Sequence, residues 1–212
     1  LTVSDLSFRV GNRVVLDDLN FSIGAGVVWI RGPNGTGKTS LLKLLGGALK
    51  AQLGEIKLSG LSLSGMTARE REAVFLCTDD LPRLPWLTAG ELVAVYASIY
   101  PGIDKAALDA TLESFKLIPV LNTSIETLSL GERRKLHLAV ALSVNSRLLL
   151  LDEALNALDA SAADQVRQEL QRRQASASQI ILITSHIDPR IAARVFDLRG
   201  GPDSRLDEVS AL

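Results

Sequence analysis

The amino-acid sequence predicts an α/β fold, with a parallel sheet as its core and a helical lobe inserted into it. Two observations indicate this fold class. Apolar runs of strand length alternate with helical patterns towards both ends of the chain, which is typical of a parallel sheet covered by helices. Between these parts lies a long stretch with helical periodicity alone. A length of 212 residues suits a single domain of this kind.

The N-terminal part is expected to contain strands, a glycine-rich loop and one helix. Short apolar runs bounded by turn residues indicate the strands. We expect these at residues 1–10, 14–23, 27–31, 55–58 and 74–77. The glycine-rich loop fills residues 32–39, and leucines at helical spacing predict a helix over 40–49.

The remainder of the chain divides into the helical stretch, a second alternation of strand and helix, and a short tail. We expect helices at residues 91–100, 104–116, 132–142 and 160–173, and strands at 148–151 and 180–184. The core then comprises about residues 1–78 and 146–199, and the helical lobe about residues 79–145. The polar residues 200–212 are expected to form a loosely held C-terminal tail.

Composition and charge exclude several classes of protein. With 47% hydrophobic and 22% charged residues, the chain fits an ordinary globular protein and not a disordered, collagen-like or coiled-coil one. Lysine and arginine total 23 against 24 acidic residues, without a dense basic run, which argues against a sequence-independent grip on nucleic acid. The single cysteine, Cys77, leaves no intramolecular disulfide and fits a reducing cytosol.

We expect neither a membrane span nor a signal peptide in this sequence. No run of about 20 apolar residues occurs. The N-terminus also lacks the charged-then-apolar pattern of a secretory signal. If this protein works at a membrane, we therefore expect it to do so through a partner.

Residues 32–39 match the phosphate-binding pattern G-x-x-x-x-G-K-[ST] at every fixed position, between an expected strand and an expected helix. Glycines let the backbone N–H groups of such a loop converge on phosphate oxygens, and the helix dipole adds to their effect. Lys38 would neutralise the β- and γ-phosphates of a nucleotide, and the hydroxyl of Thr39 would bind Mg²⁺. A glycine-rich turn that only caps a helix is the alternative. The expected nucleotide-binding residues are Gly32, Pro33, Asn34, Gly35, Thr36, Gly37, Lys38, Thr39 and Ser40.

An acidic motif ends the apolar strand at residues 148–151, where Asp152 and Glu153 follow four leucines. Such a run suits a strand buried on both faces, and ligands of such sheets bind beyond the carboxyl ends of the strands. Asp152 would then bind Mg²⁺, and Glu153 could polarise the water that attacks the γ-phosphate. The alternative is that acidic residues commonly end strands.

Ser129 and Glu132 have the spacing of a capping box at the start of a helix, which by itself indicates a structural role. Their place in the sequence suggests more. Residues 128–135 precede the acidic motif, residues 156–159 (Asn-Ala-Leu-Asp) follow it, and His186 ends the next apolar strand.

This order of motifs resembles the ATP-binding subunits of ABC transporters over nearly the whole chain. Residues 32–39 are similar to the Walker A motif, 128–132 to the LSGGQ signature, and 148–153 to Walker B with its catalytic glutamate. Asp159 resembles the D-loop aspartate, and His186 resembles the switch histidine. The resemblance implies a P-loop NTPase (RecA-like) core of the ABC ATPase type, with N-terminal antiparallel strands and an inserted helical lobe.

The resemblance also implies a mechanism. In the family two such domains meet head to tail and enclose two ATP molecules, each between the Walker A motif of one copy and the signature of the other. ATP holds the dimer together, hydrolysis releases it, and transmembrane transporter subunits follow the motion. Glu153 and His186 would be catalytic, with Mg²⁺ as the cofactor. The residues that would face the γ-phosphate in trans are Ser129, Leu130, Gly131 and Glu132.

The sequence departs from the family pattern at several positions. The signature has Leu130 in place of a glycine and Glu132 in place of a glutamine. The loop that carries Asp79 contains no glutamine where the family has one, and we consider Asp79 as a further Mg²⁺ ligand. Val10 stands where the family often stacks an aromatic ring on adenine, with Phe8 two residues earlier. Because the loop glutamine is absent and the signature is altered, we expect ATP hydrolysis to be slow.

We therefore expect an ATP-hydrolysing subunit that couples dimer closure to substrate movement by separate membrane subunits, at the cytoplasmic face of the inner (cell) membrane. The dimer would be two copies of this chain or one copy with a related ATPase subunit. Residues 84–88 and 91–100 are similar to the corresponding stretch of bacterial exporter subunits, so export is the expected direction. Trp86 and Leu87 are candidate contacts for the membrane partner, with simple packing in the lobe as the alternative.

Two other functions stay open at this point. A soluble ABC-type ATPase that acts on nucleic acid or ribosomes is disfavoured by the balanced charge and by the lack of room for a coiled-coil insertion. A switch that binds ATP and dimerises with little turnover is favoured by the altered signature. Measured turnover separates the switch from the motor, and co-purification with a membrane protein separates the motor from the nucleic-acid ATPase.

Overall fold

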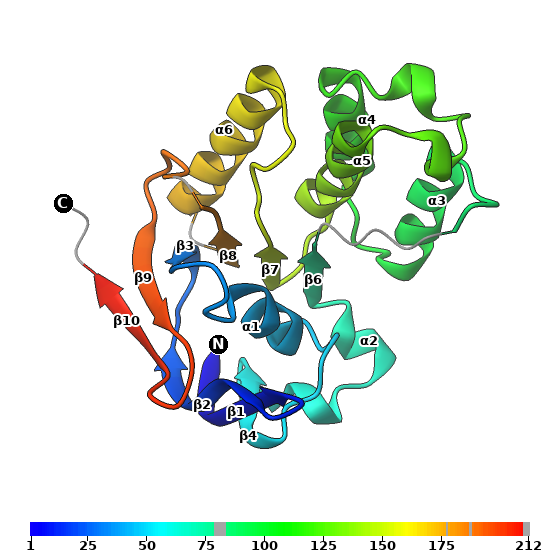
Figure 1. The fold of residues 1–212 in the computed structure, drawn as a ribbon. Coiled ribbons are helices and arrows are strands. Elements are labelled where there is room, and N and C mark those ends of the chain that lie inside the picture. Colours follow the sequence, from blue (N-terminus) through cyan, green and yellow to red (C-terminus); the bar gives the residue numbers. More distant parts are fainter. Residues whose placement is uncertain (79–83, 177, 187, 210–212) are drawn as a thin grey trace.

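The computed structural model describes residues 1–78, 84–176, 178–186 and 188–209, which form two sheets and six α-helices within these ranges (Figure 1). The α-helices and strands are, in chain order, β1 (Thr2–Val10), β2 (Arg13–Ser22), β3 (Gly26–Arg31), α1 (Lys38–Leu45), β4 (Leu53–Leu58), β5 (Leu61–Ser62), α2 (Ala68–Arg71), β6 (Val74–Cys77), α3 (Ala89–Ile99), α4 (Lys105–Ser114), α5 (Leu130–Ser143), β7 (Leu148–Leu151), α6 (Ala160–Ser176), β8 (Ile180–Thr184), β9 (Arg194–Arg199) and β10 (Arg205–Val209).

The predicted parallel sheet is confirmed as a six-stranded sheet in the order β10-β9-β3-β8-β7-β6. All of its strand pairs are parallel except β9 with β10. The predicted antiparallel N-terminal strands form a second sheet in the order β2-β1-β4-β5. Because parallel strands point the same way, β3, β7 and β8 end at one edge of the sheet, and each is followed there by a motif that the sequence analysis identified.

The hydrophobic core consists of two clusters, one on each face of the six-stranded sheet. The four leucines of β7 are fully buried and alternate between the clusters, as expected for a strand covered on both sides. Leu149 and Leu151 pack with residues of α3 to α6, whereas Leu148 and Leu150 pack with α1 and the antiparallel sheet. The sheet edge that carries the motifs is thus fixed from both faces.

The helical stretch of the sequence lies beside the β6 edge, where α3, α4 and α5 gather (Figure 1). Helix α3 begins at Ala89 because Thr88 and Glu91 form a capping box. Helix α1 ends at Leu45 and not at residue 49 as predicted, because Gly46 and Gly47 follow it and Gly47 has φ 72°.

The prediction of a loosely held tail over residues 200–212 is wrong for its central part, which forms β10. This strand pairs antiparallel with β9, in the register Leu206 to Leu198. The side chains of Phe196, Leu198 and Leu206 are buried, so an alternating pattern too short to stand out in the sequence is fixed by tertiary packing. Strand β9 was likewise not predicted. Among the residues that the structure describes, every helix is too short or too polar to cross a bilayer.

Candidate functional site

The glycine-rich loop joins β3 to α1, in the context that the phosphate-loop pattern requires. Gly37 precedes α1 with a left-handed backbone (φ 98°), and a Cβ at this position would lie 2.8 Å from Cγ1 of Val15. Both constraints require glycine at this position, and α1 begins at the next residue, Lys38. The amino end of α1, with its unpaired N–H groups, therefore lies at the loop and favours an anion there.

Lys38 supplies the positive charge of this loop. Its Nζ atom donates to the carbonyl oxygens of Gly32, at 2.7 Å, and of Pro33, at 3.1 Å, and the residue is buried. The ammonium group is therefore held within the loop and away from bulk solvent. A phosphate that enters the loop would meet a cation already in place.

Strands β2 and β9 support the loop from outside. Arg13 of β2 donates to the carbonyl oxygen of Gly35 at 3.0 Å. On the side of β9, a Cβ on Gly32 would come within 2.7 Å of the carbonyl oxygen of Leu198. Arg13 is a residue that the sequence analysis did not identify, because only the fold brings β2 to the loop.

The acidic motif follows β7 directly and is fixed by Thr184 at the end of β8. The Oγ1 atom of Thr184 donates to Oδ1 of Asp152 at 2.8 Å and accepts from the backbone N–H of Glu153 at 2.7 Å. Glu153 has a left-handed backbone (φ 49°), which costs a non-glycine residue about 1–2 kcal/mol. Thr184 was missed in the sequence, although a polar residue that ends the strand beside an acidic motif is a usable signal.

Glu153 and His186 lie side by side, with 3.2 Å between Oε1 of the carboxyl group and Nε2 of the imidazole. Burial is the main reason why the pKa of Glu153 lies above its usual 4.5. The charge of Asp152 raises this pKa further, whereas His186 and Lys38 lower it. A carboxylate with a raised pKa accepts a proton more readily near neutral pH.

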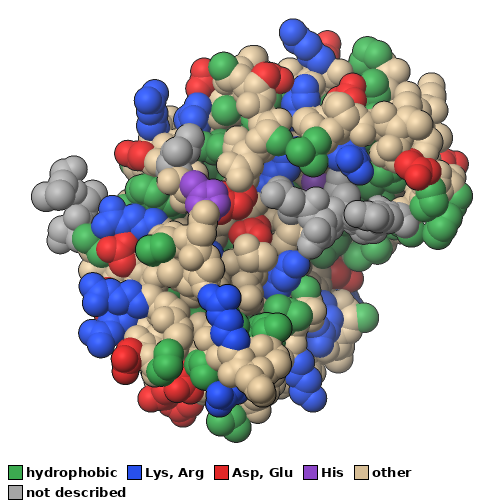
Figure 2. Space-filling view, in the orientation of Figure 1, with side chains coloured by type: hydrophobic (Ala, Val, Ile, Leu, Met, Phe, Trp, Pro, Cys, Tyr) green, Lys and Arg blue, Asp and Glu red, His purple; other side chains and the backbone are tan. Residues whose placement is uncertain are grey.

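One cavity of about 470 Å³ brings the loop and this pair together. Figure 2 shows a histidine and acidic side chains gathered near the centre of the displayed face, with basic side chains around them. The predicted residues that line the cavity are Asn34, Gly35, Gly37, Lys38, Thr39, Ser40, Glu153 and His186. Gly32 and Pro33 line an adjoining cavity of about 480 Å³, which also contacts His186. Asp152 is buried at the strand end, and Thr36 donates to the carbonyl oxygen of Pro33 inside the loop.

The rim of the cavity contains Val10, which is 60% exposed, whereas Phe8 is buried. Of the two side chains considered for contact with a base, only Val10 is therefore available to it. Asp79 lies outside the described residues.

The signature turn lies apart from this cavity, on the amino end of α5. The predicted capping box is present: Oγ of Ser129 accepts from the N–H of Glu132 at 3.2 Å, and the Glu132 carboxylate accepts from the N–H of Ser129 at 2.8 Å. Hydrogen bonds from Ser129 lower the pKa of Glu132, and the bond from the hydroxyl group has a larger effect than the bond from the backbone N–H. The carboxylate is thus turned back onto its own helix, while Leu130 beside Gly131 is 61% exposed.

Asp159 connects α6 to the signature helix. Its Oδ1 atom accepts from the N–H of Ala162 at 2.9 Å, and its Oδ2 atom lies 3.3 Å from Nζ of Lys135 on α5. The hydrogen bond from Ala162 is the main reason why the pKa of Asp159 is lowered. In the helical lobe, Trp86 is 73% exposed, whereas Leu87 packs against the core.

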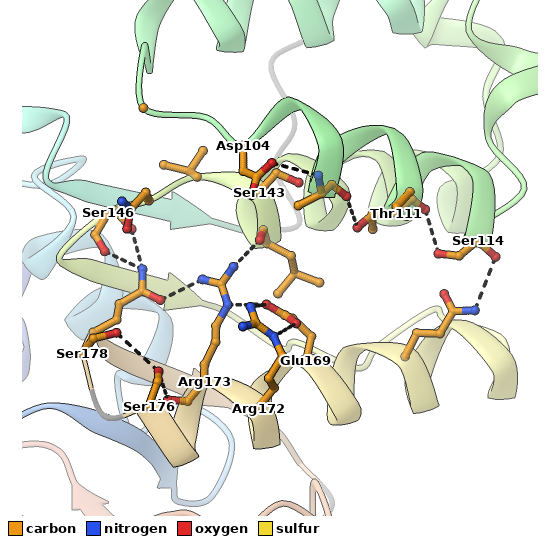
Figure 3. Close-up of a pocket in the computed structure, with 18 of the residues that line it drawn as sticks. Asp104, Thr111, Ser114, Ser143, Ser146, Glu169, Arg172, Arg173, Ser176 and Ser178 are labelled. Carbon is orange, nitrogen blue, oxygen red and sulfur yellow. Dashed lines mark hydrogen bonds and ion pairs between the residues drawn. The ribbon is translucent and has the colours of Figure 1, made fainter.

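A larger cavity of about 1040 Å³ lies between α4, the end of α5 and α6 (Figure 3). Arg173 crosses it, donating to the carbonyl oxygen of Leu142, to Gln179 at 2.8 Å and to Glu169 at 2.7 Å. These polar groups bond to one another, and the cavity shares no lining residue with the one beside Lys38. We interpret this cavity as part of the interface between the helical lobe and the core.

Comparison with known families and proteins gives consistent matches. The family described as "ABC transporter" matches residues 16–156. A taurine import ATP-binding protein of Escherichia coli O157:H7 is 34% identical, over 99% of this chain and 83% of its own length. An uncharacterized ABC transporter ATP-binding protein of Bacillus subtilis is 26% identical, over 98% of this chain and 72% of its own length. A second such protein of that organism is covered over only 61% of its length.

Two solved structures are similar in fold. An ATP-binding subunit of an ABC transporter superimposes with a TM-score of 0.84, at 23% identity, over 98% of this chain and 88% of its own. A dimeric ATP-binding cassette in a post-hydrolysis state, bound to ADP and Pi, superimposes with a TM-score of 0.79, at 20% identity, over 100% of this chain and 99% of its own. At these identities the likeness concerns the fold alone.

Proposed function

We propose that this chain, which belongs to the ABC transporter family and is one of its ATP-binding subunits, couples ATP-driven closure and hydrolysis to substrate movement through separate membrane subunits. The observation that carries the proposal is the cavity in which the buried Lys38 and the Glu153–His186 pair lie together. A cation that neutralises the phosphates and a group that accepts a proton from the attacking water are two of the parts on which phosphoryl transfer to water depends.

The proposed chemistry follows from the position of each group. The loop N–H groups, the amino end of α1 and Lys38 bind the phosphates of ATP. Glu153, ionised, accepts a proton from the water that attacks the γ-phosphate. His186 orients the Glu153 carboxylate through the 3.2 Å contact.

Thr39 and Asp152 would hold Mg²⁺, which when bound neutralises charge on the phosphates. The donor set fits this ion, because Mg²⁺ usually takes one or two protein oxygens together with phosphate and water oxygens. In the described ranges, no group of three or more His, Cys, Asp and Glu side chains could hold a metal ion by itself.

A second subunit is needed to close the proposed site. The signature turn exposes a helix amino end and Leu130 away from the cavity of its own chain. We propose that it contacts the γ-phosphate bound to another copy of this chain, in a head-to-tail dimer. A related ATPase subunit would form the same contacts in place of the second copy. The mass of the ATP-bound dimer distinguishes a homodimer from such a heterodimer.

We propose a slow turnover. Leu130 places an isobutyl group where close approach to a phosphate favours glycine, and this weakens closure. A nucleotide switch with little hydrolysis is the second candidate function, favoured by the same exposed Leu130.

The membrane partner would dock on the helical lobe, where Trp86 is exposed, and the chain would work at the cytoplasmic face of the membrane. The expectation of export gains no support from the relatives, because they include a taurine import protein. We propose that the membrane subunits set the direction, since the cavity residues bind the nucleotide and not the cargo.

The test is ATP turnover of the purified chain over a series of protein concentrations, with dimer mass followed by light scattering. Turnover that rises steeply with protein concentration, together with an ATP-dependent dimer, supports the motor. A dimer with negligible turnover supports the switch, and co-purified nucleic acid in place of a membrane protein would contradict both.

A further inference from the structure

We infer that Arg134 of the signature helix is a positioning residue for Glu153, and that through it α5 acts on the hydrolysis step. This inference rests on the proposed role of Glu153 as proton acceptor. It concerns a residue outside the lining of the ATP cavity.

Arg134 is buried, with 3% of its surface exposed, although it stands in a run of basic residues near the start of α5. Its Nη2 atom donates to the backbone carbonyl oxygens of Asp152 and, at 2.7 Å, of Glu153. Its Nη1 atom lies 3.9 Å from Sγ of Cys77, at the end of β6. A guanidinium group is buried at large cost unless it is well bonded, so these contacts fix its position.

The bond to Glu153 acts on a strained backbone. A left-handed conformation of a non-glycine residue persists only where its surroundings impose it. Glu153 is held on one side by Thr184, which accepts from its N–H, and on the other by Arg134, which donates to its carbonyl oxygen. Thr184 belongs to the central sheet, whereas Arg134 belongs to the helix that begins at the signature turn.

A second buried side chain on the same helix makes a similar contact one turn later. Nδ1 of His137 lies 3.1 Å from the carbonyl oxygen of Thr78, just beyond β6. Helix α5 is therefore bonded to the ends of two neighbouring strands of the six-stranded sheet, and of these two contacts the one from Arg134 reaches the acidic motif. A shift of α5, caused by a phosphate bound at its amino end, would move the backbone of Glu153 through Arg134.

The experiment compares Arg134→Met, which keeps the length of the stem, with Arg134→Lys, which restores one donor. Leu142→Ala is the control: this buried residue lies two turns further along α5, so the variant loosens the helix without touching Glu153. For each full-length variant we would measure kcat, KM, the Kd for ATP, the melting temperature and amide hydrogen exchange of the segment 152–157. The exchange measurement does not depend on turnover.

For Arg134→Met we expect kcat to fall about tenfold or more with the Kd for ATP within about twofold, and exchange of 152–157 to accelerate about tenfold. Arg134→Lys should recover part of both, and Leu142→Ala, at a comparable loss in melting temperature, should show neither effect. Unchanged exchange of 152–157, or a kcat within about twofold of the parent chain, would overturn the inference. Glu153→Gln, measured in parallel, tests the premise separately: if it hydrolyses ATP at the parent rate, Glu153 is not the proton acceptor and the proposed role on which this inference rests fails.

Discussion

The phosphate loop and the signature turn are both amino ends of helices, yet the chain builds them in opposite ways. At α1 the turn is concave: Lys38 is buried, β2 and β9 support the loop, and Glu153 completes the cavity. At α5 the turn is exposed: the Glu132 carboxylate bonds to its own helix cap, and Leu130 faces outward. We propose that the first region holds a nucleotide by itself, whereas the second acts only when another molecule faces it.

The largest expected effect comes from the concave region. Glu153→Gln should lower turnover by about 100-fold or more, because the amide cannot accept a proton from water. ATP should still bind, since the loop and Lys38 are untouched. Phosphate release and nucleotide binding measured on the same sample check this, and a variant that turns over freely would exclude Glu153 as the base.

Lys38→Ala should weaken ATP binding by about 10- to 100-fold, because a charge-assisted hydrogen bond to phosphate contributes about 1.5–3 kcal/mol. Titration with a fluorescent nucleotide measures the change. Lys43→Ala is the matched control, because Lys43 lies on the same helix but outside the cavity lining. This variant should bind ATP as tightly as the parent chain does. Equal loss in both variants would contradict the assigned role.

Turnover should depend on the ionisation of Glu153. Its pKa is raised mainly by burial, so the carboxylate becomes protonated at a higher pH than an exposed glutamate. Below that pKa, activity should fall about tenfold per pH unit, while ATP affinity over the same range serves as the control. If the activity begins to fall only at pH 4.5 or below, which is the usual pKa of a glutamate, the raised pKa of Glu153 is contradicted.

The smallest expected effect belongs to the exposed region. Leu130→Gly should strengthen ATP-dependent dimerisation several-fold, because it removes the side chain that hinders close approach to a phosphate. Glycine near the start of a helix costs up to about 1 kcal/mol of folding free energy, but this cost is the same in the monomer and in the dimer. Dimer dissociation constants in the Glu153→Gln background measure the gain, with Leu130→Ala as the control that keeps helix propensity. A weaker dimer in both variants would show that Leu130 supports the contact.

The same contrast explains what the sequence could predict. The phosphate loop, the acidic motif and the Ser129 capping box are local patterns, and each lies on the element expected for it. Arg13 could not be assigned in this way, because only the fold brings β2 to the loop. Thr184 was missed although it ends a predicted strand, because the contact that gives it a role is made with the end of another strand. Arg134 is one of three consecutive basic residues, and only its contacts with the end of β7 distinguish it. Strands β9 and β10 were missed because their short alternating patterns contain several charged residues.

The central claim, that each site combines the loop of one copy with the signature turn of another, is tested by complementation. Both variants are made in the Glu153→Gln background. Lys38→Ala impairs the phosphate loop and leaves the signature turn intact. Ser129→Arg blocks the signature turn and leaves the phosphate loop intact. With ATP, neither should dimerise alone, while their mixture should, because a heterodimer retains one complete site. A mixture that stays monomeric by light scattering, under conditions in which Glu153→Gln alone dimerises, would contradict the head-to-tail arrangement.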